Sequence, residues 1–100
     1  MKSRSSFEFT GKERFFQGHF PEAPILPGVM QVQFAHEAAE RLLGRPLVLK
    51  AVKKMKFVRI VEPGMPVDLE VESAEKDSGV EVAYRFVAGE STCSSGILCY

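Results

Sequence analysis

The sequence has no tryptophan, only two cysteines and no net charge. Its longest uncharged run, residues 23–35, is interrupted by two prolines and a glycine, whereas a membrane-spanning helix needs about 20 mostly apolar residues. The opening residues MKSRSSFEFTGKER contain no apolar stretch typical of a secretory signal. The cysteines, Cys93 and Cys99, lack zinc-finger spacing. These features predict a cytoplasmic protein with reduced cysteines, no bound metal, no membrane span and no bulk attraction to nucleic acid.

The 100 residues, with 45% hydrophobic and 26% charged side chains, have the composition of a soluble globular chain. That length favours a single domain over residues 1–100. A chain of this size can build one modest core but has little room to enclose a large ligand as well. We therefore expect a homodimer, or a higher oligomer of dimers, that forms its sites between subunits.

Charge is unevenly distributed along the chain. Residues 1–60 hold 11 basic and 5 acidic side chains, and residues 61–100 hold 2 basic and 8 acidic ones. Five cations fall within ten positions: Lys50, Lys53, Lys54, Lys56 and Arg59. Such a run is either a solvated face or a docking surface for an acidic partner. Strand alternation would place Lys50, Lys54 and Lys56 on one face.

One convincing helix is predicted over Gly28–Leu43, because Pro27 suits a helix start and Gly44 with Pro46 supplies the stop. Its apolar positions are numerous enough to predict burial on most sides. These positions are Val29, Val32, Phe34, Ala35, Ala38, Ala39, Leu42 and Leu43. The polar positions that form a narrow stripe are Gln33, His36, Glu37 and Glu40.

The other segments read as strands, bounded by turn residues at 63–64, 77–79 and 89–90. The expected strands are residues 5–10, a long and bulged 47–61, 67–72, 80–86 and 92–100. Short connections between the later strands favour antiparallel pairing. One helix cannot cover both faces of such a sheet, so we expect an α+β architecture in which the sheet curls around the helix.

The segment FFQGHFPEAPILPGV, residues 15–29, places His19 in an apolar, proline-stiffened loop that runs into the start of the helix. The first amides of a helix are unpaired donors at the positive end of its dipole. A histidine beside such donors suits acid–base chemistry on a carbonyl compound. By itself, a lone histidine among aromatic residues is more often structural.

This string closely resembles the signature of the hotdog-fold 3-hydroxyacyl-acyl-carrier-protein dehydratases. Residues 56–64, KFVRIVEPG, are similar to that family's second strand and its proline–glycine turn. The segment ILPGVMQVQFA resembles most closely the branch of this family that is associated with aryl-polyene pathways. The resemblance implies a hotdog fold, in which an antiparallel sheet wraps around one long central helix.

The resemblance also implies roles for particular residues. His19 matches the base that removes the α-proton, and Gly28 matches the glycine whose N–H holds the thioester carbonyl. The family's helix carboxylate lies five positions after that glycine, where this chain has Gln33. Glu37 stands where many members have glutamine, so the pair looks exchanged, and His36 is a weaker candidate for the acid. The residues expected to line the acyl tunnel beside Gly28 are Phe20, Pro27 and Val29.

An amide has no proton to give, so the roles on the helix stay open. Glu37 is either the general acid or an ordinary helix carboxylate. Gln33 is either a hydrogen-bonding group for the substrate hydroxyl or a buried residue that anchors the helix. The motif around His19 makes a purely structural role the weaker interpretation.

The implied activity is dehydration of 3-hydroxyacyl thioesters on an acyl carrier protein to trans-2-enoyl thioesters, in fatty-acid or polyketide-like lipid biosynthesis. The chemistry requires no cofactor, and the partner is a carrier bearing a phosphopantetheine-linked acyl chain. One alternative is a hotdog thioesterase that uses Glu37 and Gly28. Another is a non-catalytic partner or acyl-binding subunit that kept the fold and lost the acid.

Overall fold

The computed structural model describes residues 1–10, 12–13 and 26–100. The expected site residues His19 and Phe20 lie outside these ranges, as does most of the motif segment before the helix. The described elements, in chain order, are β1 Lys2–Glu8, α1 Gly28–Leu43, β2 Ala51–Phe57, β3 Pro66–Lys76, β4 Gly79–Ala88 and β5 Ser91–Cys99. The predicted bounds of the helix are confirmed.

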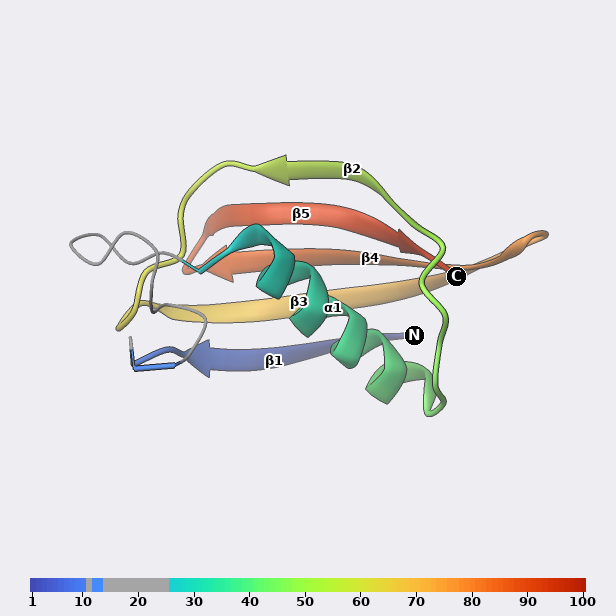
Figure 1. Ribbon diagram of the computed structural model, residues 1–100, viewed down its shortest axis with the longest axis horizontal. Coiled ribbons are helices and arrows are strands. Elements are labelled where there is room, and N and C mark those ends of the chain that lie inside the picture. Colours follow the sequence, from blue (N-terminus) through green and yellow to red (C-terminus); the bar gives the residue numbers. More distant parts are fainter. Residues whose placement is uncertain (11, 14–25) are drawn as a thin grey trace.

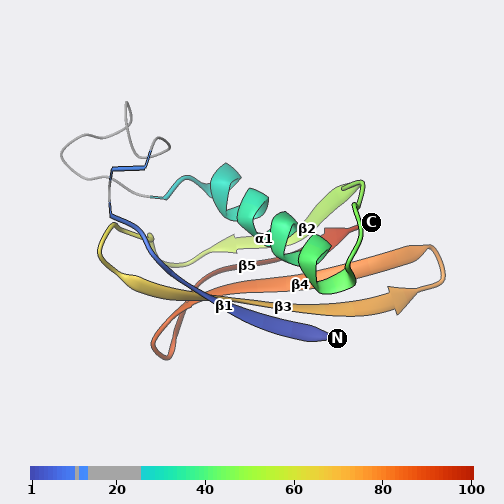
Figure 2. The same ribbon diagram turned by 90° about the horizontal axis from the view of Figure 1, so that it is seen from below.

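The five strands form one antiparallel sheet in the order β1-β3-β4-β5-β2. The helix crosses one face of this sheet diagonally (Figure 1). Seen from below, the strands twist and curve beneath α1, and no described helix covers the other face (Figure 2). The expected α+β arrangement, one helix held against a curved antiparallel sheet, is therefore confirmed.

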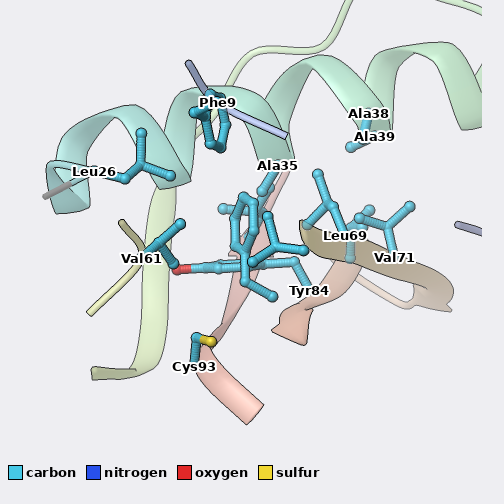
Figure 3. Close-up of a cluster of buried hydrophobic side chains, with 14 residues drawn as sticks. Phe9, Leu26, Ala35, Ala38, Ala39, Val61, Leu69, Val71, Tyr84 and Cys93 are labelled. Atoms are coloured by element: carbon cyan, nitrogen blue, oxygen red, sulfur yellow. The ribbon is translucent and has the colours of Figure 1, made fainter. Parts of the chain in front are cut away.

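The core lies between α1 and the inner face of the sheet (Figure 3). Alternation puts Val67, Leu69 and Val71 of β3 inward, and Val82, Tyr84 and Phe86 of β4 do the same; all six are buried. Phe9 also packs in this core, although the first strand covers residues 2–8 rather than the predicted 5–10. Phe9 is therefore apolar because its side chain is buried in the core, although it lies outside the strand.

Strand β2 is shorter than predicted and carries the expected bulge. Lys53 pairs with Ile97 and Lys56 pairs with Ser95, so Lys54 and Met55 together lie opposite one residue of β5. Lys54 adopts a positive φ of 52° at this bulge. The extra residue reverses the alternation, so Lys53 and Lys56 share the outer face. The prediction that Lys50, Lys54 and Lys56 share one face is therefore wrong.

The helix is less enclosed than predicted, because its contact with the sheet is narrow. Ala35, Ala38 and Ala39 are buried there, since their small side chains allow a close approach to the sheet. Val29, expected on the apolar face, is 76% exposed in the single chain. Gln31, which the sequence analysis did not single out, is buried.

The outer face of the sheet is polar and joined by ion pairs. Arg4 of β1 contacts Asp68 and Glu70 of β3, both at 2.6 Å, and Arg85 of β4 contacts Glu70 at 2.7 Å. Lys53 of β2 contacts Glu81 of β4 at 3.2 Å. Cys93 and Cys99 are both free thiols, as predicted. Within the described residues, no helix is long and apolar enough to cross a membrane.

Candidate functional site

The N-terminus of α1 presents unpaired backbone donors. Pro27 is the N-cap residue, and its carbonyl accepts the N–H groups of Met30 and Gln31, each at 3.1 Å. The amides of Gly28 and Val29 have no acceptor among the described residues. They lie at the positive end of the helix dipole, where negative charge is stabilised. This end of the helix can therefore bind a carbonyl oxygen on which charge develops.

Gly28 leaves room for an aromatic ring from the sheet. A β-carbon built on Gly28 would stand 2.8 Å from Cζ of Phe57, the last residue of β2. The bulge in β2 brings Phe57 to the same face as Val52, the face toward the helix. Phe57 is itself 55% exposed. The ring therefore adds an apolar surface beside the first residue of the helix.

A buried polar contact holds the start of the helix against the sheet. The side-chain amide of Gln31 donates to the carbonyl of Leu26 at 3.1 Å, and the hydroxyl of Ser94 donates to Oε1 of Gln31 at 2.5 Å. Gln31 and Ser94 are 3% and 0% exposed. The signal available in the sequence was a glutamine one turn before Ala35, on the face that packs against the sheet.

Gln33 and Glu37 lie together on the outer side of the helix. The amide of Gln33 donates to Oε1 of Glu37 at 3.5 Å, which is a long hydrogen bond. Gln33 is exposed and Glu37 is partly buried. Gln33 is therefore not the buried anchor considered from sequence; Gln31 has that position instead. In the single chain Gln33 faces solvent, and Glu37 does so in part.

His36, the weaker candidate for the acid, is occupied by other contacts. Its Nδ1 lies 2.7 Å from the Tyr100 hydroxyl, and its Nε2 lies 3.5 Å from Oε2 of Glu40. Glu40 also accepts the N–H of Leu47 at 2.9 Å. Burial, with a smaller contribution from Glu40, raises the pKa of Tyr100 to about 12. His36 therefore links the helix to the end of β5 and does not share the contacts of Gln33 and Glu37.

The structure places Pro27, Gly28 and Val29 at the start of the helix, Gln33 about one turn after Val29, and Glu37 one turn farther, past the middle of the helix. The placement of His19 and Phe20 is not described. A hollow of about 670 Å³ lies away from this end, against Arg4, Glu70 and Arg85 of the sheet. In the part of the chain that the structure describes, no group of three His, Cys, Asp or Glu side chains could hold a metal ion.

Comparisons with known proteins agree with this arrangement. The family model described as ApeI dehydratase matches residues 2–97. The FabZ 3-hydroxyacyl-[acyl-carrier-protein] dehydratase of Erythrobacter litoralis is 42% identical over 86 residues, which are 77% of this chain and 55% of the relative. The FabZ of Oenococcus oeni is 36% identical over 98 residues, covering 89% of this chain and 70% of the relative.

A solved structure, the dehydratase heterocomplex ApeI:P from Xenorhabdus doucetiae, superposes with a TM-score of 0.87 and 26% sequence identity. That match covers 97% of this chain and 84% of the other. The chain spans about half the length of the Erythrobacter relative. With a family match that covers nearly all its residues, the chain has the hotdog fold and belongs to the ApeI-like dehydratase family.

Proposed function

We propose that the chain dehydrates 3-hydroxyacyl thioesters carried on an acyl carrier protein to trans-2-enoyl thioesters, in fatty-acid or polyketide-like lipid biosynthesis. The observation that carries the proposal is the pair of amides at Gly28 and Val29, which have no acceptor among the described residues, on the helix that also bears Gln33 and Glu37. The His19 motif immediately before this helix, and the family to which the chain belongs, support the same reaction.

The proposed reaction removes one proton and one hydroxyl from neighbouring carbons. The Gly28 N–H binds the thioester carbonyl and stabilises the enolate charge. His19 takes the proton from C2, and the electrons of that C–H bond form the C2=C3 double bond. The C3–O bond breaks, and the hydroxyl leaves as water with a proton from Glu37. Gln33 supplies a hydrogen bond to the hydroxyl and to Glu37.

We further propose that the chain forms a homodimer through β2. This strand is at the edge of the sheet, and one of its sides pairs with no described strand, so a second copy could pair there. Large apolar side chains that are exposed in the single chain gather along this edge and at the start of the helix: Val29, Val48, Met55, Phe57, Val58 and Ile60. Pairing would cover these side chains and would place the sites near the subunit boundary.

The basic segment Lys50–Arg59 is the proposed docking surface for the carrier's acidic surface. Lys54, Lys56 and Arg59 are exposed and have no ion-pair partner among the described residues. Lys53 differs, because it is paired with Glu81. Unpaired exposed cations steer an acidic partner more effectively than neutralised ones.

Incubation of the purified protein with a 3-hydroxyacyl carrier, followed by intact-mass measurement of the carrier, tests the function. We expect a loss of 18 Da, about the mass of one water, that the His19→Ala variant does not produce. Loss of the whole acyl group would instead support the thioesterase alternative. An unchanged carrier with a folded protein would contradict both activities.

A partner subunit without its own activity is a second candidate. It is favoured by Gln33 at the family's carboxylate position and by the solved relative described as a heterocomplex. Sedimentation and activity separate the candidates. An active homodimer supports the first, whereas a chain that dehydrates substrate only when mixed with a second hotdog subunit supports the second.

A further inference from the structure

The entry to α1 is held from two sides by hydrogen bonds to the buried residue Leu26. The Leu26 N–H donates to the Val61 carbonyl at 2.7 Å, and the Leu26 carbonyl accepts the side-chain amide of Gln31 at 3.1 Å. Leu26 is only two residues before Gly28, and both it and Val61 are buried. The backbone N–H and the carbonyl of Leu26 are therefore both hydrogen-bonded, which fixes the segment that leads into the helix.

The Gln31 side chain is itself fixed by the sheet. Its Oε1 accepts the hydroxyl of Ser94 at 2.5 Å, and Ser94 is fully buried on β5. With Leu26 and Ser94 both bound, the amide group has a defined orientation. A buried amide that lost one partner would leave an unpaired polar group in the core, which is costly. The contact therefore resists rotation of the helix start relative to β5.

The same part of β5 also anchors the chain after β2. The Cys93 carbonyl accepts the N–H groups of Val58 and Arg59, at 2.8 and 3.0 Å. Cys93 and Ser94 are adjacent, so one short stretch of β5 holds both the helix start and the segment that follows Phe57. Figure 3 shows Leu26 at the helix start and Val61 close to it, with Cys93 farther along the sheet.

We propose that Gln31 and Ser94 are positioning residues, which act through Leu26 to aim the Gly28 amide at the thioester carbonyl. Neither side chain faces solvent, and neither reaches the outer stripe of Gln33 and Glu37. Their effect is on geometry, and a displacement of about 1 Å in a catalytic group can cost about 10²-fold in rate. This inference rests on the proposed dehydratase function, since it assigns the Gly28 amide to the carbonyl.

The Ser94→Ala variant tests the proposal with a minimal change in volume, and Gln31→Met removes both hydrogen bonds while keeping the side chain's length. Leu98→Val is the matched control, because Leu98 is equally buried on β5 and makes no contact with Gln31 among the described hydrogen bonds. For each variant, kcat and KM are measured on an acyl-pantetheine substrate, with the free energy of unfolding and the ¹H–¹⁵N signal of Gly28.

We expect Ser94→Ala to lower kcat about tenfold, to leave KM within about twofold and to shift the Gly28 signal. Gln31→Met should lower kcat further. Leu98→Val should lose a comparable free energy of unfolding with kcat and the Gly28 signal unchanged. An active wild type whose kcat is unaffected by Ser94→Ala overturns the proposal, as does an equal loss of kcat in Leu98→Val.

Failure of the proposed function is a separate result. A wild type that releases no water from any 3-hydroxyacyl substrate rejects the dehydratase, and the Gly28 signal then decides the positioning role alone. A shift of the Gly28 signal in Ser94→Ala that is absent from Leu98→Val supports the positioning role. An unchanged signal in both variants overturns it.

Discussion

The ring of Phe57 lies against Gly28 so closely that a β-carbon on Gly28 would stand 2.8 Å from the ring's Cζ atom. The contact joins the end of β2 to the first residue of the helix, beside the amides of Gly28 and Val29. Phe57 is more than half exposed, so its ring can move aside if the space is filled. The absence of a side chain on Gly28 therefore affects the geometry of the site more than the stability of the fold.

Gly28→Ala should reduce kcat/KM by about tenfold or more, because the new methyl and the displaced ring obstruct the carbonyl's approach to the amide. The free energy of unfolding should change by less than about 1 kcal/mol, since alanine favours helix. Adding Phe57→Leu should restore much of the activity, with Phe57→Leu alone as the control. Full activity of Gly28→Ala would show that the amide is approached from another side.

The exchanged positions of Gln33 and Glu37 predict how substitutions at these two residues change the dehydration rate. Glu37→Gln should lower the dehydration rate by about 10²-fold or more, because it removes the proposed proton donor. The double variant Gln33→Glu with Glu37→Gln restores the family's order and should recover much of the rate. The variants are compared with the wild type by their steady-state rates on one substrate and by their free energies of unfolding.

Two outcomes would contradict the exchange. If Glu37→Gln keeps the wild-type rate, Gln33 or a bound water handles the hydroxyl. If the wild type is inert and Gln33→Glu alone gains activity, the chain is a non-catalytic family member that has lost its acid.

The basic segment predicts a selective effect on carrier-bound substrates. Lys56→Glu with Arg59→Glu should raise KM for an acyl-carrier substrate by about tenfold and leave KM for a small acyl-pantetheine nearly unchanged. Lys76→Glu, an exposed substitution at the end of β3, is the matched control. An equal loss on both substrates would point to a change in the site itself.

Replacement of Tyr84 by phenylalanine should raise the stability of the fold. The Tyr84 ring crosses Gly96 of β5, and its buried hydroxyl has no hydrogen-bond partner among the described residues. Burial also raises the pKa of this phenol. Tyr84→Phe should raise the free energy of unfolding by about 1 kcal/mol, because it removes an unpaired buried polar group.

Urea denaturation measures that change, and Gly96→Ala serves as the opposing variant. A β-carbon there would stand 2.6 Å from a ring carbon of Tyr84, so a loss of about 1–3 kcal/mol is expected. A lower stability of Tyr84→Phe would mean that the hydroxyl has a partner after all.

The ion pairs on the outer face of the sheet predict how the free energy of unfolding depends on pH. Hydrogen bonds from Ser6 and Arg4 lower the pKa of Asp68, and Arg85 with Arg4 lowers that of Glu70. Because the folded-state values are depressed, this stabilisation is present above the unfolded pKa of about 4 and is lost as pH falls through the folded values.

Arg4→Gln should therefore make the free energy of unfolding less dependent on pH between about 5 and 2, as measured by urea denaturation at several pH values. Lys76→Gln is the control and should keep the wild-type slope. A slope that stays unchanged in Arg4→Gln would show that these ion pairs do not link folding to protonation.

Local features of the sequence determined the elements and the motif. Pro27 and Gly44 set the helix bounds, because one fixes φ and the other accepts a left-handed φ of 69°. Alternation determined which residues of β3 and β4 are buried, because successive side chains point to opposite faces. The resemblance to the dehydratase family pointed to Gln33 and Glu37, and their spacing of four residues predicted that they share one face of the helix.

The tertiary structure decided the contacts that depend on pairing between distant segments. The register of β2 against β5 places Phe57 on the helix side, because two residues of β2 oppose Gly96. The partner of Gln31 is Ser94, 63 positions away, and nothing local to either residue indicates the other. Side-chain periodicity and capping are local properties, whereas register and burial arise only when the helix meets the sheet.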